Sequence, residues 1–255
     1  MHYSVLYEHP LNEVIRVCLR LEQLFQQIDH SLADTSAIGT RNTLLLIIHI
    51  LQILDRPDLK TKLAKEISQH ITSLNRYSEA PDVDNVRLTA LTGQLTAVAR
   101  KLIDSTGKIG QRLRDIELFN NLRLPLSSPG GACSFEVPVF HYWLHQSPTV
   151  RHTTIIDWLN DFTEIRTTIE LVLELVRKKA STVSKTAIHG FHQELLDPQA
   201  NLRLIRIGVD SEIPAFPEIS VGRHFLSIRF YTPNIYQRPS QYSDDLGFAL
   251  TYCHL

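Results

Sequence analysis

Hydrophobic side chains recur every three or four residues through the first two thirds of the chain, the spacing of one face of an α-helix. The first such run follows Asn12, a suitable N-cap, after His9-Pro10 has ended a short strand expected over residues 3–8. Its apolar face comprises Val14, Val17, Cys18, Leu21, Leu24, Phe25, Ile28 and Leu32. Its polar face comprises Glu13, Arg16, Arg20, Gln23 and Gln27. The pattern predicts an amphipathic helix that packs by one face and presents two arginines on the other.

The same spacing predicts further helices as far as residue 179. They span about 42–55, 57–77, 85–104, 111–122, 137–145 and, as the longest element, 149–179. Pro57 suits the first turn of its helix, and residues 78–84 are expected to form a turn. Residues 124–138 are rich in proline, glycine and serine and are predicted to be irregular.

From about residue 184 the pattern shortens to strand-like runs at 186–192, 202–210, 224–231 and 247–252. Helices followed by strands exclude an alternating Rossmann-type order and predict an α+β fold. We expect a helical bundle domain over 10–180 and an antiparallel β-rich domain over 184–255, completed by strand 3–8.

One of these strands has an unusual outer face. Alternation places His224, Leu226, Ile228 and Phe230 toward a core, and Arg223, Phe225, Ser227 and Arg229 outward. Two arginines beside an aromatic ring suit an acidic, partly apolar peptide.

Composition limits the classes of function. The 255 residues are 43% hydrophobic and 21% charged, as in globular proteins, and the net charge of −1 gives no general attraction to nucleic acid or acidic membranes. Three widely spaced cysteines suit neither a disulfide framework nor a zinc site and favour a reducing compartment. No signal peptide is recognisable, and the longest apolar run, 44–53, is too short to span a bilayer. We therefore expect a cytoplasmic, soluble protein without membrane insertion.

Two enzyme-like constellations are incomplete. His141 and His145 have the i, i+4 spacing of zinc ligands, but the adjacent glutamate and a third ligand are missing. Cys133 follows a tight Pro-Gly-Gly turn and could use His141 as a base, but no orienting Asn or Asp is identifiable. We expect no enzyme, no metal and no cofactor. A zinc- or thiol-dependent enzyme at these residues, or a weak nucleic-acid binder, remains the alternative.

Arg16 and Arg20 repel each other across one helical turn, and Glu13 is the acid within reach of Arg16. The residues alone leave two interpretations open: solvated arginines, or a surface for an acidic partner.

Three segments carry a family resemblance: YEHPLNEVIRVCLRLE, SSPGGACSFEVPVFHYWLH and HFLSIRF resemble, in the same order, the ZapD family of bacterial cell-division proteins. The resemblance implies a cytoplasmic homodimer at mid-cell that has a helical and a β-domain, binds the C-terminal tail of FtsZ, bundles its filaments and performs no catalysis. The family's basic tail-binding positions match Arg16, Arg20, Arg56, His141 and Arg229 here. Phe225 and Glu117 stand where the family can carry basic residues, and Arg223 is expected to substitute for the former.

Overall fold

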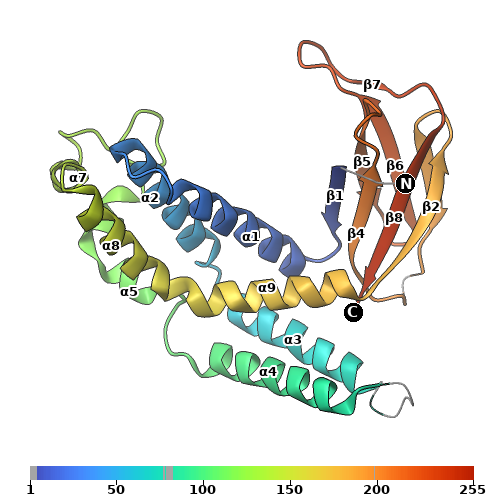
Figure 1. The fold of residues 1–255 in the computed structure, drawn as a ribbon, viewed down its shortest axis with the longest axis horizontal. Coiled ribbons are helices and arrows are strands. Elements are labelled where there is room, and N and C mark those ends of the chain that lie inside the picture. The colour runs from blue at the N-terminus through green and yellow to red at the C-terminus, as the bar shows by residue number, and fades with distance from the viewer. Residues whose placement is uncertain (1–4, 77, 79–82, 198) are drawn as a thin grey trace. The chain divides into compact units, whose positions relative to one another are not determined.

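The computed structural model describes residues 5–76, 78, 83–197 and 199–255, and it confirms the α+β class (Figure 1). The chain divides into two compact units, Val17–Val172 and Met1–Arg16 with Leu173–Leu255. We call them the helical unit and the sheet unit. The first division falls within α1 (Glu13–Ser31) and the second within α9 (Thr163–Lys178). The domain limits expected from the sequence, 10–180 and 184–255, stay a prediction.

The helical unit is built from amphipathic helices, with an irregular connection over residues 123–137. Beyond its part of α1 and α9, it contains α2 (Ala37–Ile53), α3 (Leu59–Asn75), α4 (Asn85–Asp104), α5 (Gln111–Asp115), α6 (Glu117–Leu122), α7 (Pro138–Leu144) and α8 (Pro148–Leu159). α1 begins where predicted, because the Asn12 side chain accepts a hydrogen bond from the Ile15 amide at 2.8 Å. α4 has the predicted limits, and α3 and α4 lie side by side as a hairpin (Figure 1).

The predicted helix 149–179 is wrong, because a 3₁₀ turn, Asn160–Phe162, separates α8 from α9. The Arg112 guanidinium binds at the 3₁₀ turn: it donates to the Asp157 carbonyl at 2.7 Å and to the Asp161 carboxylate at 2.7 Å. In a continuous helix that carbonyl would accept from residue 161, so the arginine competes with the helical bond.

Three other helix predictions need correction. The segment 111–122 is two helices, because Ile116 is extended with φ −77° and ψ 119°. Pro57 does not open α3, whose N-cap is Asp58. The second helix begins earlier than predicted, since the Ser36 hydroxyl caps it by accepting from Gly39 N at 3.1 Å. Residue 77, the predicted end of the third helix, and residues 79–82 of the predicted turn lie outside the described residues.

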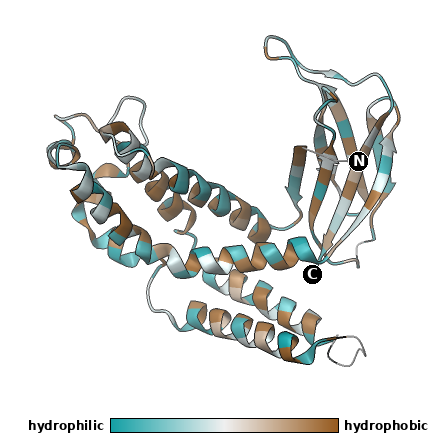
Figure 2. Cartoon of the chain, viewed as in Figure 1, coloured by the Kyte–Doolittle hydropathy of each residue, from teal (hydrophilic) through white to brown (hydrophobic). Residues whose placement is uncertain are grey.

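The longer helices contribute apolar stripes to the core of this unit, visible as brown bands along their ribbons in Figure 2. α1 provides Val17, Cys18, Leu21, Phe25 and Ile28, all at most 4% exposed. At the other end of the unit, aromatic rings cluster around Trp158, which lies 4.9 Å from Phe119 and 5.4 Å from Trp143 between ring centroids.

A single buried arginine fastens three segments of the helical unit. Arg151 on α8 is 6% exposed, and its guanidinium donates to four oxygens. These are Thr35 O at 2.6 Å, Thr40 Oγ1 at 3.2 Å, Leu144 O at 2.8 Å and Gln146 O at 2.5 Å. The acceptors are neutral carbonyl and hydroxyl groups, so the charge is stabilised by hydrogen bonds instead of by an ion pair.

The sheet unit contains two antiparallel four-stranded sheets. The first has the order β1-β4-β8-β2, formed by Val5–Pro10, Leu202–Val209, Leu246–His254 and Ala180–Ala187. The second has the order β3-β6-β5, formed by Phe191–Leu195, Phe225–Thr232 and Phe216–Val221, with the short β7, Ser240–Gln241, paired to β6. Alternate residues of β4, β6 and β8 form one shared core that includes Ile207, Ile228 and Phe248, each 0% exposed. The unit is therefore a β-sandwich.

The N-terminal strand completes the first sheet, as expected, through the register Val5↔Val209 to Pro10↔Leu204. Residues 3 and 4 of the predicted strand lie outside the described residues. Glu8 on this strand binds two arginines: Arg177 at 2.9 and 2.7 Å and Arg206 at 3.0 Å. The carboxylate therefore ties β1 to the end of α9 and to β4.

One strand prediction is wrong, and one strand was missed. The run 186–192 crosses the tight turn between β2 and β3, where His189 and Gly190 have φ values of 47° and 70°. β5 was missed, because Pro217 and Glu218 interrupt the alternation. Proline is tolerated there because β5 lies at the edge of its sheet.

Candidate functional site

The polar face of α1 is arranged as the sequence predicts. Arg16 and Arg20 are exposed one turn apart, and Arg16 Nη1 lies 2.8 Å from Glu13 Oε2. This exposed i, i+3 pair contributes little to stability. Burial lowers the pKa of His9 from 6.5, and the positive charge of Arg16 lowers it further. The start of α1 therefore disfavours a protonated His9 beside Arg16.

Arg229 lies at the centre of β6 on the outer face of its sheet. Its guanidinium lies 5.3 Å from the centroid of the Phe191 ring, and its partners in register are Phe191 on β3 and Glu218 on β5. Phe225, on the same face, is 43% exposed. An arginine stacked on an aromatic ring keeps its donors available to a carboxylate while the ring offers apolar contact.

The inner face of β6 confirms the alternation, since Leu226, Ile228 and Phe230 are 0% exposed. Two flanking predictions are wrong. His224 is exposed instead of facing the core, and Arg223 lies in the turn between β5 and β6 instead of on the strand face. The reason is that β6 begins at Phe225, where the turn closes with a hydrogen bond from Gly222 N to Phe225 O at 2.9 Å. Arg223 is nonetheless exposed.

His141 and Arg56 lie on the helical unit. His141 is exposed in the last turn of α7, with its ring centroid 4.4 Å from that of His145. Arg56 is exposed in the connection between α2 and α3. Glu117, where the family can be basic, is exposed at the first position of α6.

The six predicted partner-binding residues are thus divided between the units. Arg16, Arg223 and Arg229 belong to the sheet unit, and Arg20, Arg56 and His141 belong to the helical unit. All six side chains are exposed. Their convergence into one pocket stays a prediction. Sequence reasoning missed Phe191, the ring beneath Arg229, because the strand ending at residue 192 was misplaced. The alternation of Phe191 and Gln193 after the His189-Gly190 turn was the available signal.

The enzyme-like constellations remain incomplete in the part of the chain that the structure describes. No group of three His, Cys, Asp or Glu residues there could hold a metal ion. The Cys133 thiol donates to Gly130 O at 3.1 Å, and its amide donates to Glu136 at 2.9 Å. These contacts fix a loop turn instead of pairing the thiol with a base.

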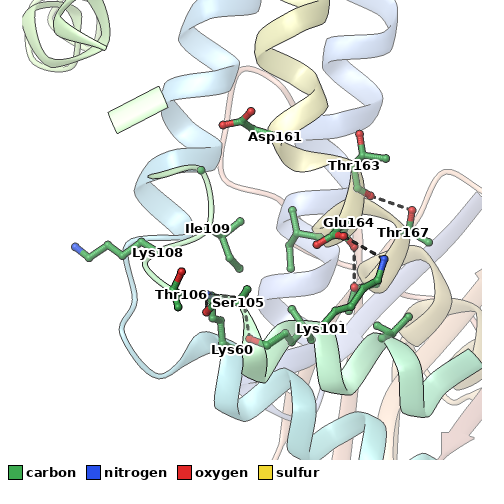
Figure 3. Close-up of a pocket in the computed structure, with 15 residues that line it drawn as sticks. Lys60, Lys101, Ser105, Thr106, Lys108, Ile109, Asp161, Thr163, Glu164 and Thr167 are labelled. Carbon is green, nitrogen blue, oxygen red and sulfur yellow. Dashed lines mark hydrogen bonds and ion pairs between the residues drawn. The ribbon is translucent and has the colours of Figure 1, made fainter. Parts of the chain in front are cut away.

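A cavity of about 480 Å³ opens beside the end of α4 and the start of α9 (Figure 3). Its rim is polar, but its cations already have partners. Lys60 donates to Ser105 O at 2.9 Å and to Gly107 O at 2.6 Å, and Lys101 lies 3.2 Å from Glu164. These contacts hold the α3–α4 hairpin to the rest of the helical unit.

Comparison with known proteins gives consistent matches across the chain. The family model ZapD, described as cell division protein, matches residues 19–229. The chain is 35% identical over 255 residues to the cell division protein ZapD of Methylococcus capsulatus, covering 100% of both chains. It is 35% identical over 251 residues to that of Nitrosomonas europaea, covering 98% of this chain and 95% of the relative. With that of Coxiella burnetii it shares 31% over 254 residues, covering 99% and 98%. None of the helices among the described residues combines the length and apolarity of a membrane span.

Proposed function

Because this chain belongs to the ZapD family of cell division proteins, we propose that it is an adaptor that binds the C-terminal tail of FtsZ and crosslinks FtsZ filaments as a homodimer. It acts in the cytoplasm at mid-cell, and its work is binding instead of catalysis. The relatives compared above are likewise named as cell division proteins.

The observation that carries the proposal is the exposed pair Arg16 and Arg20 on the polar face of α1. Two like charges one turn apart are unfavourable by a few tenths of a kcal/mol, roughly, and an acidic peptide relieves this repulsion. Arg229 on Phe191 adds a second basic and aromatic contact of the kind that grips an acidic, partly apolar segment. Arg56, Arg223 and His141 supply further exposed basic groups.

A flexible tail loses conformational entropy when it is ordered on a surface, so each tail contact is expected to be weak. A dimer compensates by presenting two sites, and binding at the second site becomes effectively intramolecular. Filament bundling therefore depends on both the basic residues and the dimer.

The test is charge reversal in the full-length protein. Arg16→Glu combined with Arg20→Glu should abolish co-sedimentation of FtsZ bundles and should weaken binding of a fluorescent FtsZ-tail peptide by at least about tenfold. The matched control is Arg87→Glu combined with Arg100→Glu, two exposed arginines of α4. The control should bundle like the wild type. Undiminished bundling by the α1 variant, with its circular dichroism unchanged, would refute the role of this surface.

The oligomeric state gives an independent test. Sedimentation equilibrium should show a dimer at the concentrations that bundle filaments. A strict monomer that still bundles would contradict crosslinking by two equivalent sites.

A further inference from the structure

Three cations of the helical unit surround one carboxylate. Asp55, just after α2, receives Arg114 Nη1 at 2.8 Å and Lys108 Nζ at 3.3 Å on Oδ1, and Arg123 Nη2 on Oδ2. We call these four residues the Asp55 cluster. Arg114 is the least exposed of the three cations, at 12%, and it also donates to the Leu51 carbonyl at 2.7 Å.

The Asp55 cluster carries an uncompensated charge. Three cations and one carboxylate sum to a net charge of +2. Burial acts to raise the pKa of Asp55, but the hydrogen bond from Arg123 and the charge of Arg114 outweigh it and lower the pKa, so the carboxylate is ionised at neutral pH. Burial lowers the pKa of Arg114, and the positive charge of Arg123 lowers it further. The negative charge of Asp55 acts in the opposite direction but does not restore the ordinary value. One carboxylate therefore does not satisfy the guanidinium groups around it.

A cavity of about 130 Å³ lies against the cluster, lined also by Ile48, Leu51, Phe119 and Asn120. Arg114 Nε is buried and has no hydrogen-bond partner among the described residues, whereas a buried N–H donor is normally hydrogen-bonded. Figure 3 shows the Lys108 side chain directed away from the other labelled residues of the larger cavity. Its ammonium group belongs to the Asp55 cluster.

We propose that Lys108, Arg114 and Arg123 form a binding site for a dianionic phosphate group, either free or carried by a small phosphomonoester. A phosphate carries a charge of about −1.5 to −2 at neutral pH, which matches the net charge of the cluster. Its three acceptor oxygens suit guanidinium donors in a fork arrangement, and the cavity can accommodate a group of about this size.

The first test measures binding of sodium phosphate to the full-length protein by isothermal titration calorimetry, with sodium chloride at matched ionic strength as the reference. Phosphate should bind saturably. Arg123→Gln should weaken the affinity about tenfold, because it removes a charged donor. Arg112→Gln is the matched control, since both arginines are 49% exposed and ion-paired but Arg112 binds Asp157 and Asp161. The control should keep the wild-type affinity. Absence of saturable binding, or equal loss in both variants, overturns the site.

A second measurement needs no substitution. Nitrogen-15 spectra of the arginine side chains should show the Nε–Hε signals of Arg114 and Arg123 shifting saturably with phosphate and not with chloride. Glycerol 3-phosphate is the second probe: tighter binding than inorganic phosphate indicates a phosphomonoester ligand, and weaker binding indicates free phosphate. If no arginine signal shifts with either probe, the proposal is wrong.

Discussion

Replacing Glu8 with glutamine should destabilise the sheet unit by about 2 kcal/mol. The carboxylate binds Arg177 through both oxygens and Arg206 through one, and the three side chains are 19%, 26% and 24% exposed, respectively. Losing a fully buried ion pair costs about 3–5 kcal/mol and an exposed one about 0–1 kcal/mol. Partial burial with a bidentate arginine places Glu8 between these limits.

The assay must report on the correct unit. Both tryptophans, Trp143 and Trp158, lie in the helical unit, so their fluorescence serves as an internal control. Amide hydrogen exchange of peptides from β1 and β4 should accelerate by roughly 30-fold, which corresponds to about 2 kcal/mol of opening free energy.

Glu174→Gln is the matched control for Glu8→Gln. Glu174 forms an exposed i, i+4 pair with Lys178 on α9, and its loss should cost less than about 0.5 kcal/mol. If the two variants accelerate exchange equally, the reasoning from burial and bidentate geometry is refuted.

Three further predictions concern other buried groups. Arg151→Leu should destabilise the helical unit by about 3 kcal/mol, measured by urea unfolding with tryptophan fluorescence, because it leaves buried carbonyls without donors. Ellman's reagent should modify Cys133 first in the native protein, since burial raises the pKa of Cys18 to about 12 and that of Cys253 to about 11, and both should react only on unfolding. The pKa of His9 lies below its unfolded value of 6.5, so the unfolded state takes up the proton first as the pH falls. The free energy of unfolding of the sheet unit should therefore decrease as the pH drops below 6.5. Urea titrations at several pH values should show a weaker dependence for His9→Gln.

The sequence predicted those elements whose causes are local. α1 and α4 follow from helical periodicity, and the Asn12 cap lies three residues from the amide that it receives. The break between α8 and α9 depends on Arg112, which is 45 residues away from Asp157, while the apolar spacing continues across the break. Periodicity alone could not reveal it.

The missed strands have the same explanation. Seven of the eight residues of β2 are exposed or half-exposed, so their pattern does not indicate a strand. β2 is a strand because it pairs with β8 from Ala180↔Cys253 to Ala187↔Leu246. β5 contains Pro217 and is held by its register with β6. Their conformation comes from partners distant in the chain, whereas strand propensity reflects chiefly how side chains pack against such partners.

The candidate sites were predictable to different degrees. Exposure of Arg16, Arg20 and Arg229 follows from the alternation of apolar and polar positions, which the structure confirms. The Phe191 ring beneath Arg229 depends on strand register. In the Asp55 cluster, Asp55 binds residues that lie 53 to 68 positions later in the chain, and no local pattern indicates these contacts.

The bonds of Arg151 differ chemically from those of Glu8, with a consequence for the order in which the molecule loses structure. Glu8 holds its arginines only while it is ionised, so acid or concentrated salt weakens these contacts. The oxygens that hold Arg151 are carbonyl and hydroxyl groups, which do not titrate. Acidification should therefore weaken the contacts of Glu8 in the sheet unit while the junction of α2, α7 and α8 keeps the hydrogen bonds of Arg151.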